Sequence, residues 1–426
     1  MRVGERMRQL TARILMGAMY TWERLESGVA YSFGAPAFME DPHSVYRALR
    51  ERQPVHRSRL VRGWVFTRHA DCLALFRDAR LSADFRNQAF YSRLKKAQLK
   101  AGRTEEELQR PTMLNSDPPR HTRLRGLVSK AFTPRAVRSL EGRMVEIVDE
   151  MLDAASGQSE LCVIDTLAYP LPVIIICEML GIPTEDGDRF RHWSDEVVRG
   201  LGIATLDDLR ASIQAARELI AYLEPIAEAR RREPRDDLLS GLLQAEEEGD
   251  RLTMEEVFQT VLLLLVAGNE TTTKLIGNGL LALLQHPEQL ALLRENPDRI
   301  DTAVEELLRW DGPVHATGRA ALEDFEFQGA RIEKGQMVMI GIAGANRDPA
   351  CFPDPETLDI ERAENPHLSL GHGRHSCLGA SLARLEARSA LGGLVERYPN
   401  MKLTSAKPAW GTNAALRGLT TLPVHV

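Results

Sequence analysis

Hydrophobic positions recur with helical spacing over most of the middle of the chain. Between about residues 133 and 310, apolar side chains return every three or four residues, which places them on one face of a helix. Alternation typical of strands is confined to short segments. The pattern predicts a mainly α fold with small β-sheets at its edges. We expect helices at 136–155, 184–199, 207–232 and 253–286, a strand at 64–67, a hairpin of 325–332 with 337–342, and another hairpin beyond Leu416.

The expected helix at 253–286 has an unusual interior. Thr253 and Glu256 form a capping-box signature at its start, and Pro287 marks its end. Such a helix would be about 50 Å long at roughly 1.5 Å per residue. An apolar run at 261–266 is followed by Ala-Gly-Asn-Glu-Thr-Thr-Thr at 267–273. Glycine and threonine are poor helix formers, so we expect a function to favour them there.

Composition and organisation narrow the class of protein. The 426 residues carry a formal net charge of −6, which argues against a nucleic-acid-binding protein. We find no repeat, low-complexity tract or flexible linker, so we expect a single domain at 41–426 preceded by a helical segment at 1–40. The uncharged run at 14–22 is too short to span a bilayer, although a basic amphipathic helix there would be able to touch a membrane surface.

The five cysteines are scattered and form no pair or cluster with metal-ligand spacing. An odd number without such clusters fits a reducing cytoplasm better than a disulfide framework, a zinc site or an iron–sulfur centre. Four of them have ordinary neighbours and are expected to be buried and inert. These are Cys72, Cys162, Cys177 and Cys351.

Cys377 lies in a loop with a different composition. Gly371 and Gly373 permit a tight backbone passage before it, and the periodic segment 378–397 follows it as a helix. A helix N-terminus stabilises a thiolate through its dipole and its free N–H groups. Next to it, Arg374 and His375 supply positive charge suited to carboxylates. We therefore expect Cys377 to be a functional thiolate.

This loop resembles the haem-binding signature of the cytochrome P450 family, Phe-Gly-x-Gly-x-His/Arg-x-Cys-x-Gly, with Leu370 in place of the aromatic residue. The resemblance implies a thiolate ligand for the iron of haem b, and the leucine is expected to affect the redox potential rather than ligation. It implies Cys377 as the metal ligand, and haem contacts from His121, Arg125, Ala267, Gly268, Arg319, Leu370, Gly371, His375 and Gly379.

Other motifs agree with the resemblance in their order along the chain. Glu306-Leu-Leu-Arg309 is similar to the family's Glu-x-x-Arg helix, and Arg362 to the arginine that completes its buried ion network. Residues 117–125 resemble the start of the family's haem-side helix, where His121 and Arg125 share a face. The resemblance spans residue 41 to the C-terminus and implies the family's triangular, mainly helical prism.

Glu270 and Thr271 resemble the acid–alcohol pair with which family members deliver protons for dioxygen cleavage. Ala267 and Gly268 leave space beside them, and a hydrogen bond from Thr271 to a backbone carbonyl would enlarge it. In the competing interpretation, Glu270 forms an ordinary ion pair with Lys274 and Thr271 is a surface hydroxyl. We favour the proton relay, because both residues fall in the middle of a buried helix.

The resemblance also implies partners. No flavin- or nicotinamide-binding fingerprint accompanies the haem motifs, so we expect electrons from a ferredoxin or flavodoxin with its reductase. The expected docking residues are Arg120, Arg123, Lys130 and Arg374. The expected substrate is lipophilic, such as a terpenoid, steroid, fatty acid or macrolide. Its pocket is expected to be lined from 85–114, 185–213, 263–267, 314–317 and 413–416. We expect the protein to act as a monomer.

Three functional hypotheses are therefore open. The leading one is a monooxygenase that hydroxylates or epoxidises its substrate. A peroxide-driven or isomerising haem-thiolate enzyme is a second, and the presence of Glu270 and Thr271 argues against it, since peroxide-driven members of the family often lack this pair. A haem-thiolate sensor without turnover is the third, disfavoured because no signalling module accompanies the motifs.

Overall fold

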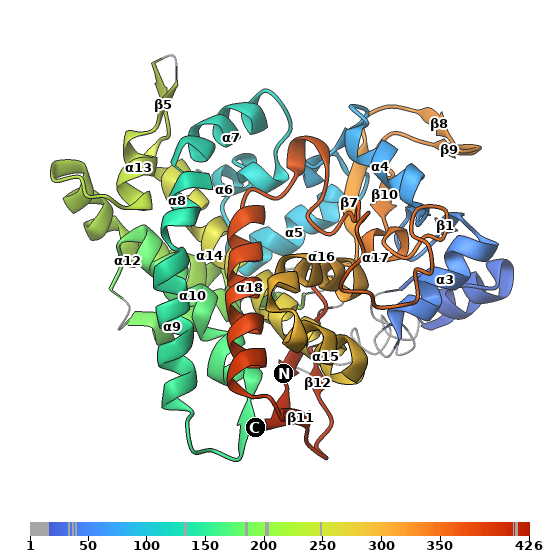
Figure 1. The fold of residues 1–426 in the computed structure, drawn as a ribbon. Coiled ribbons are helices and arrows are strands. Elements are labelled where there is room, and N and C mark those ends of the chain that lie inside the picture. Colours follow the sequence, from blue (N-terminus) through green and yellow to red (C-terminus); the bar gives the residue numbers. More distant parts are fainter. Residues whose placement is uncertain are drawn as a thin grey trace, which may run out of the picture.

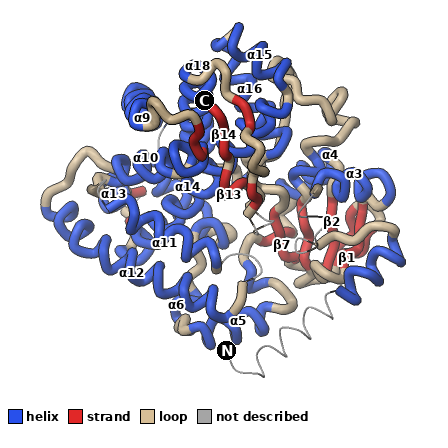
Figure 2. The backbone as a smooth tube through the Cα atoms, turned by 90° about the horizontal axis from the view of Figure 1, so that it is seen from below, coloured by secondary structure: helices blue, strands red, loops and turns tan. Residues whose placement is uncertain are grey.

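The computed structural model describes residues 17–426 apart from 33–34, 36–37, 39–40, 132–133, 184–185, 201–203, 248, 412 and 414–415. Within the expected N-terminal helical segment, residues 17–27 are helical, and 1–16 lie outside the described residues. Helices make up most of the molecule, and the largest sheet lies at one side of it (Figures 1 and 2), which confirms the predicted fold class. The helices are α3 (Pro42–Arg52), α4 (His69–Arg77), α5 (Tyr91–Ala101), α6 (Glu105–Gln109), α7 (Arg120–Ala131), α8 (Pro134–Ser139), α9 (Glu141–Ala154), α10 (Pro170–Leu180), α11 (Gly187–Arg199), α12 (Leu206–Arg232), α13 (Leu238–Gln244), α14 (Met254–Gln285), α15 (Pro287–Glu295), α16 (Ile300–Asp311), α17 (Ile342–Ala345) and α18 (Ala380–Arg397).

Helix α14 runs through the middle of the molecule. Thr253 caps its N-terminus and exchanges hydrogen bonds with Glu256, which confirms the predicted capping box. Its apolar side chains pack against α10, α16 and α18, and Figure 1 shows α18 standing upright beside α9. Because α14 is covered by protein on several sides, the poor helix formers of its interior are held by packing rather than by propensity.

The largest sheet has the strand order β1-β2-β10-β7-β3 and lies beside α3 and α4 (Figure 2). Its β10 is parallel to β2 and antiparallel to β7, so segments far apart in sequence meet here. Arg319 lies opposite Val338 in this register, and the sheet thereby sets its position. The strands are β1 (Val55–Ser58), β2 (Gly63–Phe66), β3 (Leu81–Ser82), β7 (Thr317–Ala321) and β10 (Met337–Ile340).

The expected hairpin between 325–332 and 337–342 is wrong in its pairing. Strand β8 (Phe325–Phe327) instead pairs with β9 (Ala330–Ile332), because Gln328 and Gly329 both adopt positive φ and make a two-residue turn between them. Gly335, also at positive φ, then redirects the chain, and β10 joins the large sheet.

The C-terminal hairpin prediction and one helix prediction also need correction. Strand β13 (Leu419–Thr421) pairs with β12 (Ala409–Trp410), whereas β14 (Pro423–His425) lies between β11 (Lys402–Leu403) and β4 (Glu160–Cys162). The two C-terminal strands therefore find partners elsewhere and not each other. The helix expected at 136–155 is divided into α8 and α9 before Glu141, and local sequence gives no cause for the break.

A buried ion network fixes the segment that leads to the cysteine loop. Arg309 donates two hydrogen bonds of 2.7 Å to the Glu306 carboxylate, and Arg362 donates a third at 3.1 Å. Arg309 also donates to the backbone carbonyls of Asn346, Pro355 and Thr357. Glu306 and Arg309 are fully buried, as the Glu-x-x-Arg resemblance predicted. The network thus ties the irregular chain after α17 to helix α16.

Candidate active site

The cysteine loop closes on itself just before α18. The backbone N–H of Cys377 donates to the carbonyl of Leu370 at 2.8 Å, and Gly371 and Gly373 have φ values of 68° and 71°. A Cβ atom on Gly373 would lie 2.9 Å from the carbonyl oxygen of Phe76, so this position requires glycine for space as well as for conformation. The helix begins at Ala380, two residues later than the sequence pattern indicated.

The thiol of Cys377 is exposed to a cavity, and its pKa is raised overall. Burial raises the pKa of the Cys377 thiol, whereas the Gly379 backbone N–H and the guanidinium groups of Arg125 and Arg384 lower it. Arg125 also donates to the carbonyl oxygen of Ser376 at 2.8 Å, which fixes the loop from the α7 side. An electrophilic metal at the sulfur would overcome the effect of burial.

A cavity lies beside Cys377, and its empty space, including the opening to solvent, measures about 940 Å³. Its walls come from α7, α10, α14 and α18 together with the cysteine loop. Of the predicted pocket segments, 85–114 contributes Met113 and Leu114, and 263–267 contributes Leu263, Leu264 and Ala267. The described residues of the predicted segments 185–213, 314–317 and 413–416 are not among those that line it, although a backbone bridge joins Val314 to Leu416.

Basic side chains gather beside the cysteine loop. The rings of His121 and His375 have centroids 4.1 Å apart. Burial and the neighbouring charges of Arg319, His121, Arg374 and Arg125 lower the pKa of His375 to about 3. The pKa of Arg319 is lowered to about 10 by burial, against the effect of Asp117. This repulsive arrangement would be stabilised by an anionic ligand.

The residues at this cavity fit a haem group. The Nε2 atom of His375 is buried and has no hydrogen-bond partner among the described residues, and His121 and His375 both line the cavity with Arg125. A buried polar atom without a partner is costly unless a ligand satisfies it. Two carboxylates would satisfy this atom and neutralise the basic group. Cys377 on the cavity wall would supply a thiolate sulfur for the iron.

Helix α14 contributes another part of the cavity wall. Thr271 donates from Oγ1 to the carbonyl oxygen of Ala267 at 2.6 Å, which confirms the predicted hydrogen bond. A Cβ atom on Gly268 would meet nothing within 4 Å, so open space lies beside the helix here. Ala267, Gly268 and Thr271 all line the cavity.

Glu270 is placed differently from these neighbours. Its carboxylate pairs with the Lys274 ammonium, and both side chains are largely buried, with 12% of each exposed. Burial lowers the pKa of Lys274 to about 8, opposed by Asp195. Glu270 is not among the residues that line the cavity. The ion pair weighed as the competing interpretation is therefore present.

Several cavity residues were not predicted from the sequence, among them Pro172, Ile176 and Glu386. Pro172 and Ile176 of α10 line the apolar part of the wall, and Glu386 of α18 is a buried carboxyl group there. Burial raises the pKa of Glu386 to about 8, opposed by a hydrogen bond from Thr272. Glu386 shares a helical face with the apolar residues Leu382 and Ala390, and this position was the sequence signal for a buried carboxyl group.

Several of the expected docking residues are already paired within the protein. Arg120 and Arg123 both pair with Glu256, at 3.3 and 2.9 Å, and Arg123 also pairs with Asp250. Lys130 has an interaction partner as well. A patch for an acidic carrier therefore depends on these pairs opening or on Arg374.

Residues 79–409 match the family model described as Cytochrome P450. The chain belongs to the cytochrome P450 family. The polyketide biosynthesis cytochrome P450 PksS of Bacillus subtilis is 41% identical over 400 residues, covering 91% of this chain and 96% of that protein. The vitamin D(3) 25-hydroxylase of Pseudonocardia autotrophica is 43% identical over 393 residues, covering 91% and 94%. The solved structure of PksS is similar to that of this chain, with a TM-score of 0.84 and 39% sequence identity. The match covers 93% of this chain and 99% of the PksS chain.

Membership confirms three expectations from the sequence. The P450 fold is confirmed by the similarity to solved P450 structures, and haem is the cofactor of the family. The chain is accordingly a haem-dependent enzyme of the P450 monooxygenase class. Among the residues that the structure describes, none of the helices has the length and apolar content needed to cross a bilayer.

Proposed function

We propose that residues 41–426 act as one catalytic domain that hydroxylates or epoxidises a lipophilic small molecule. The observation that carries the proposal is the position of Cys377 on the cavity wall, with Ala267, Gly268 and Thr271 of α14 on the same cavity. Bound haem would supply an iron centre that activates dioxygen, with the Cys377 sulfur as its proposed thiolate ligand. The five free cysteines fit a reducing cytoplasm.

The residues of the site have separate proposed roles in binding the cofactor. Cys377 is the proposed iron ligand, with the Gly379 N–H as a donor to its sulfur. Arg125 and Arg319 are proposed to bring positive charge to the propionates, and His121 and His375, whose pKa values are lowered, to bind them as neutral hydrogen-bond donors. Leu370 and Gly371 complete the turn that presents the sulfur.

The proposed proton route uses α14. Thr271 Oγ1 holds a proton at the cavity wall and is anchored by the carbonyl oxygen of Ala267. Glu270 is the proposed donor to this hydroxyl, which requires its pair with Lys274 to open. Because burial lowers the pKa of Lys274 to about 8, that pair exchanges a proton more readily than an ordinary lysine pair would.

Substrate and electron donor are proposed from chemistry and from relatives. The cavity wall away from the basic group is aliphatic, with Leu114, Pro172, Ile176, Leu263 and Leu264, and such a surface positions a lipophilic molecule by shape. The names of relatives include polyketide biosynthesis and vitamin D(3) hydroxylation, which supports this substrate class. Electrons are proposed to come from a ferredoxin or flavodoxin with its reductase.

The test is spectroscopic and catalytic. The haem-loaded protein is expected to show the thiolate-type absorption of the ferrous–CO complex, and Cys377→Ser to lose it. With a ferredoxin, its reductase and a library of lipophilic compounds, we expect compounds that shift the haem spectrum to be oxidised. A Cys377→Ser protein with an unchanged ferrous–CO spectrum would rule out the ligand, and spectral binders that never yield product would favour a sensor.

A further inference from the structure

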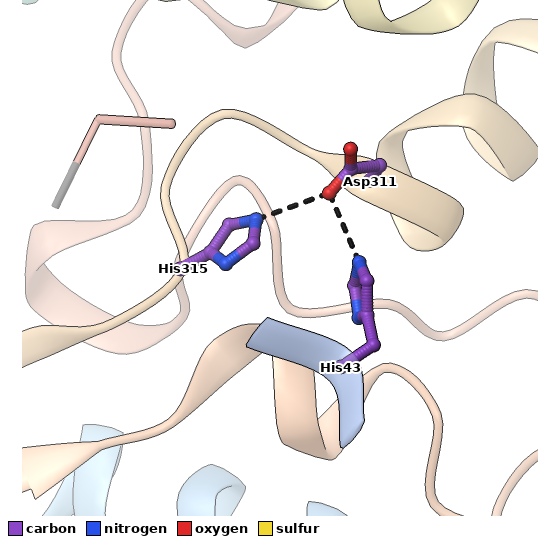
Figure 3. A group of neighbouring side chains, drawn as sticks. All are labelled: His43, Asp311 and His315. Carbon is purple, nitrogen blue, oxygen red and sulfur yellow. Dashed lines mark hydrogen bonds and ion pairs between the residues drawn. The ribbon is translucent and has the colours of Figure 1, made fainter. Parts of the chain in front are cut away.

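A second group of metal-binding side chains lies outside the haem cavity. Figure 3 shows His43 of α3, Asp311 at the end of α16 and His315 in the segment before β7, with both rings directed at one carboxylate. His43 Nε2 and His315 Nε2 lie 3.0 and 3.1 Å from the same Asp311 oxygen, Oδ1. None of the three residues lines the haem cavity.

The three donor atoms already have nearly the spacing of zinc ligands. Zinc binds imidazole nitrogen and carboxylate oxygen at about 2.0–2.2 Å in a tetrahedron, which separates neighbouring ligand atoms by about 3.3–3.5 Å. Each nitrogen therefore needs to move only a few tenths of an ångström from Oδ1. All three atoms lie within 4.8 Å of one another, so a modest rotation of the rings completes the triangle. The second Asp311 oxygen or a water is available as the fourth ligand.

Burial and charge are compatible with an ion at this place. His315 is fully buried, whereas 16% of the His43 side chain and 15% of Asp311 are exposed, which leaves an entry path. Arg347 and Arg417 are nearby cations that oppose a metal. The Arg347 guanidinium pairs with Glu356 at 2.8 Å, and the Arg417 guanidinium lies 3.8 Å from the centre of the Trp410 ring. The local positive charge is thereby partly compensated.

We propose that His43, Asp311 and His315 form a structural site for a divalent transition-metal ion of the zinc type. Two imidazoles and one carboxylate suit zinc better than calcium or magnesium, which prefer oxygen ligands. A bound ion would join the N-terminal part of α3 to the end of α16 and to the segment that leads into β7. The site is structural, because the haem cavity is elsewhere.

The experiment measures zinc on the haem-loaded protein. After dialysis against a chelator and then against Zn²⁺ alone, followed by gel filtration, zinc and haem iron are quantified by mass spectrometry. We expect about one zinc per haem in the wild-type protein and a fall in zinc affinity of at least tenfold in His43→Gln. His425→Gln is the matched control, since His425 is an exposed histidine paired with Glu160 and is expected to leave zinc binding unchanged.

A second measurement needs no variant, in case His43→Gln loads haem poorly. Zinc is expected to raise the unfolding temperature of the wild-type protein, and a chelator to reverse the rise, because a ligand of the folded state stabilises it. No zinc above the blank on the wild-type protein would overturn the site and leave Asp311 as a hydrogen-bond acceptor for two histidines. Equal zinc retention in His43→Gln would overturn it as well.

Discussion

Glu306→Gln tests the buried ion network at its centre. The Glu306 carboxylate accepts five hydrogen bonds, from two atoms of Arg309, from Arg362, from Asn365 and from the backbone of Asp359. Glutamine has the same size and removes the charge, and its amide group turns one accepting oxygen into a donor. Arg309 keeps its three backbone acceptors but loses its buried counter-charge.

The expected loss follows from the contacts. If the amide nitrogen replaces Oε1, Arg309 Nη2 and the N–H of Asp359 each face a donor instead of an acceptor. Two unsatisfied buried donors cost about 1–3 kcal/mol each. A second estimate of the same loss comes from buried ion pairs, where removing one partner costs about 3–5 kcal/mol, and the two estimates overlap. We therefore expect Glu306→Gln to lower the free energy of unfolding by about 3–5 kcal/mol, a large part of the usual total of about 5–15 kcal/mol.

The assay follows Soret absorbance and far-UV circular dichroism of the haem-loaded protein against urea concentration. The matched control is Glu361→Gln, because Glu361 pairs with Arg299 at 3.3 Å on the surface, where 45% and 47% of the side chains are exposed. A pair of that kind contributes about 0–1 kcal/mol. We expect a much lower urea midpoint and lower haem retention for Glu306→Gln alone. Equal midpoints for the two variants would refute the argument that burial makes this network strong.

Three further predictions concern the active site and its surroundings. Thr271→Ala removes the hydroxyl bound to Ala267, and we expect reductant consumption to continue with less product and more hydrogen peroxide; unchanged coupling would show that protons arrive by another route. Arg319→Gln removes a charge from the basic group, and the rate of haem transfer to apomyoglobin is expected to rise at least tenfold, whereas an unaltered rate would exclude a role in propionate binding. Although burial raises the pKa of Glu305, hydrogen bonds from Arg384 and His367 hold it at about 2. A lowered carboxyl pKa stabilises the folded protein above the ordinary value of 4.5, and this stabilisation disappears as the pH falls towards 2. Between these pH values, the free energy of unfolding of Glu305→Gln should therefore fall less steeply than that of the wild type.

Local sequence was sufficient for the parts of the site that short-range chemistry determines. The glycines before Cys377 and the capping box of α14 act within a few residues, so their structural consequences can be predicted from the local sequence. The partnership of Glu306 with Arg362 joins distant segments, and it was predicted only through the resemblance in motif order.

Other features depend on packing between elements and were not predictable from one sequence. Strand β10 has the alternation of a hairpin partner for its neighbours, but its actual partners are β2 and β7. Pro172 and Ile176 are apolar residues of an apolar helix, and only the placement of α10 turns them towards the cavity. The pairing of Glu270 with Lys274 was one of two open interpretations, because helical spacing permits the contact without requiring it.

The parallel pairing of β2 with β10 has a consequence for the protein during its synthesis. Gly63 lies opposite Met337, so Trp64, Val65 and Phe66 leave the ribosome long before the strand that covers their edge. The other edge of β2 pairs with its sequence neighbour β1, so one edge waits uncovered. An uncovered strand edge is prone to aggregation, and contacts between residues so distant in sequence form slowly. Arg319 reaches its place beside the cysteine loop only when this sheet closes. The capture of haem is therefore expected late in folding, after nearly the whole chain has emerged.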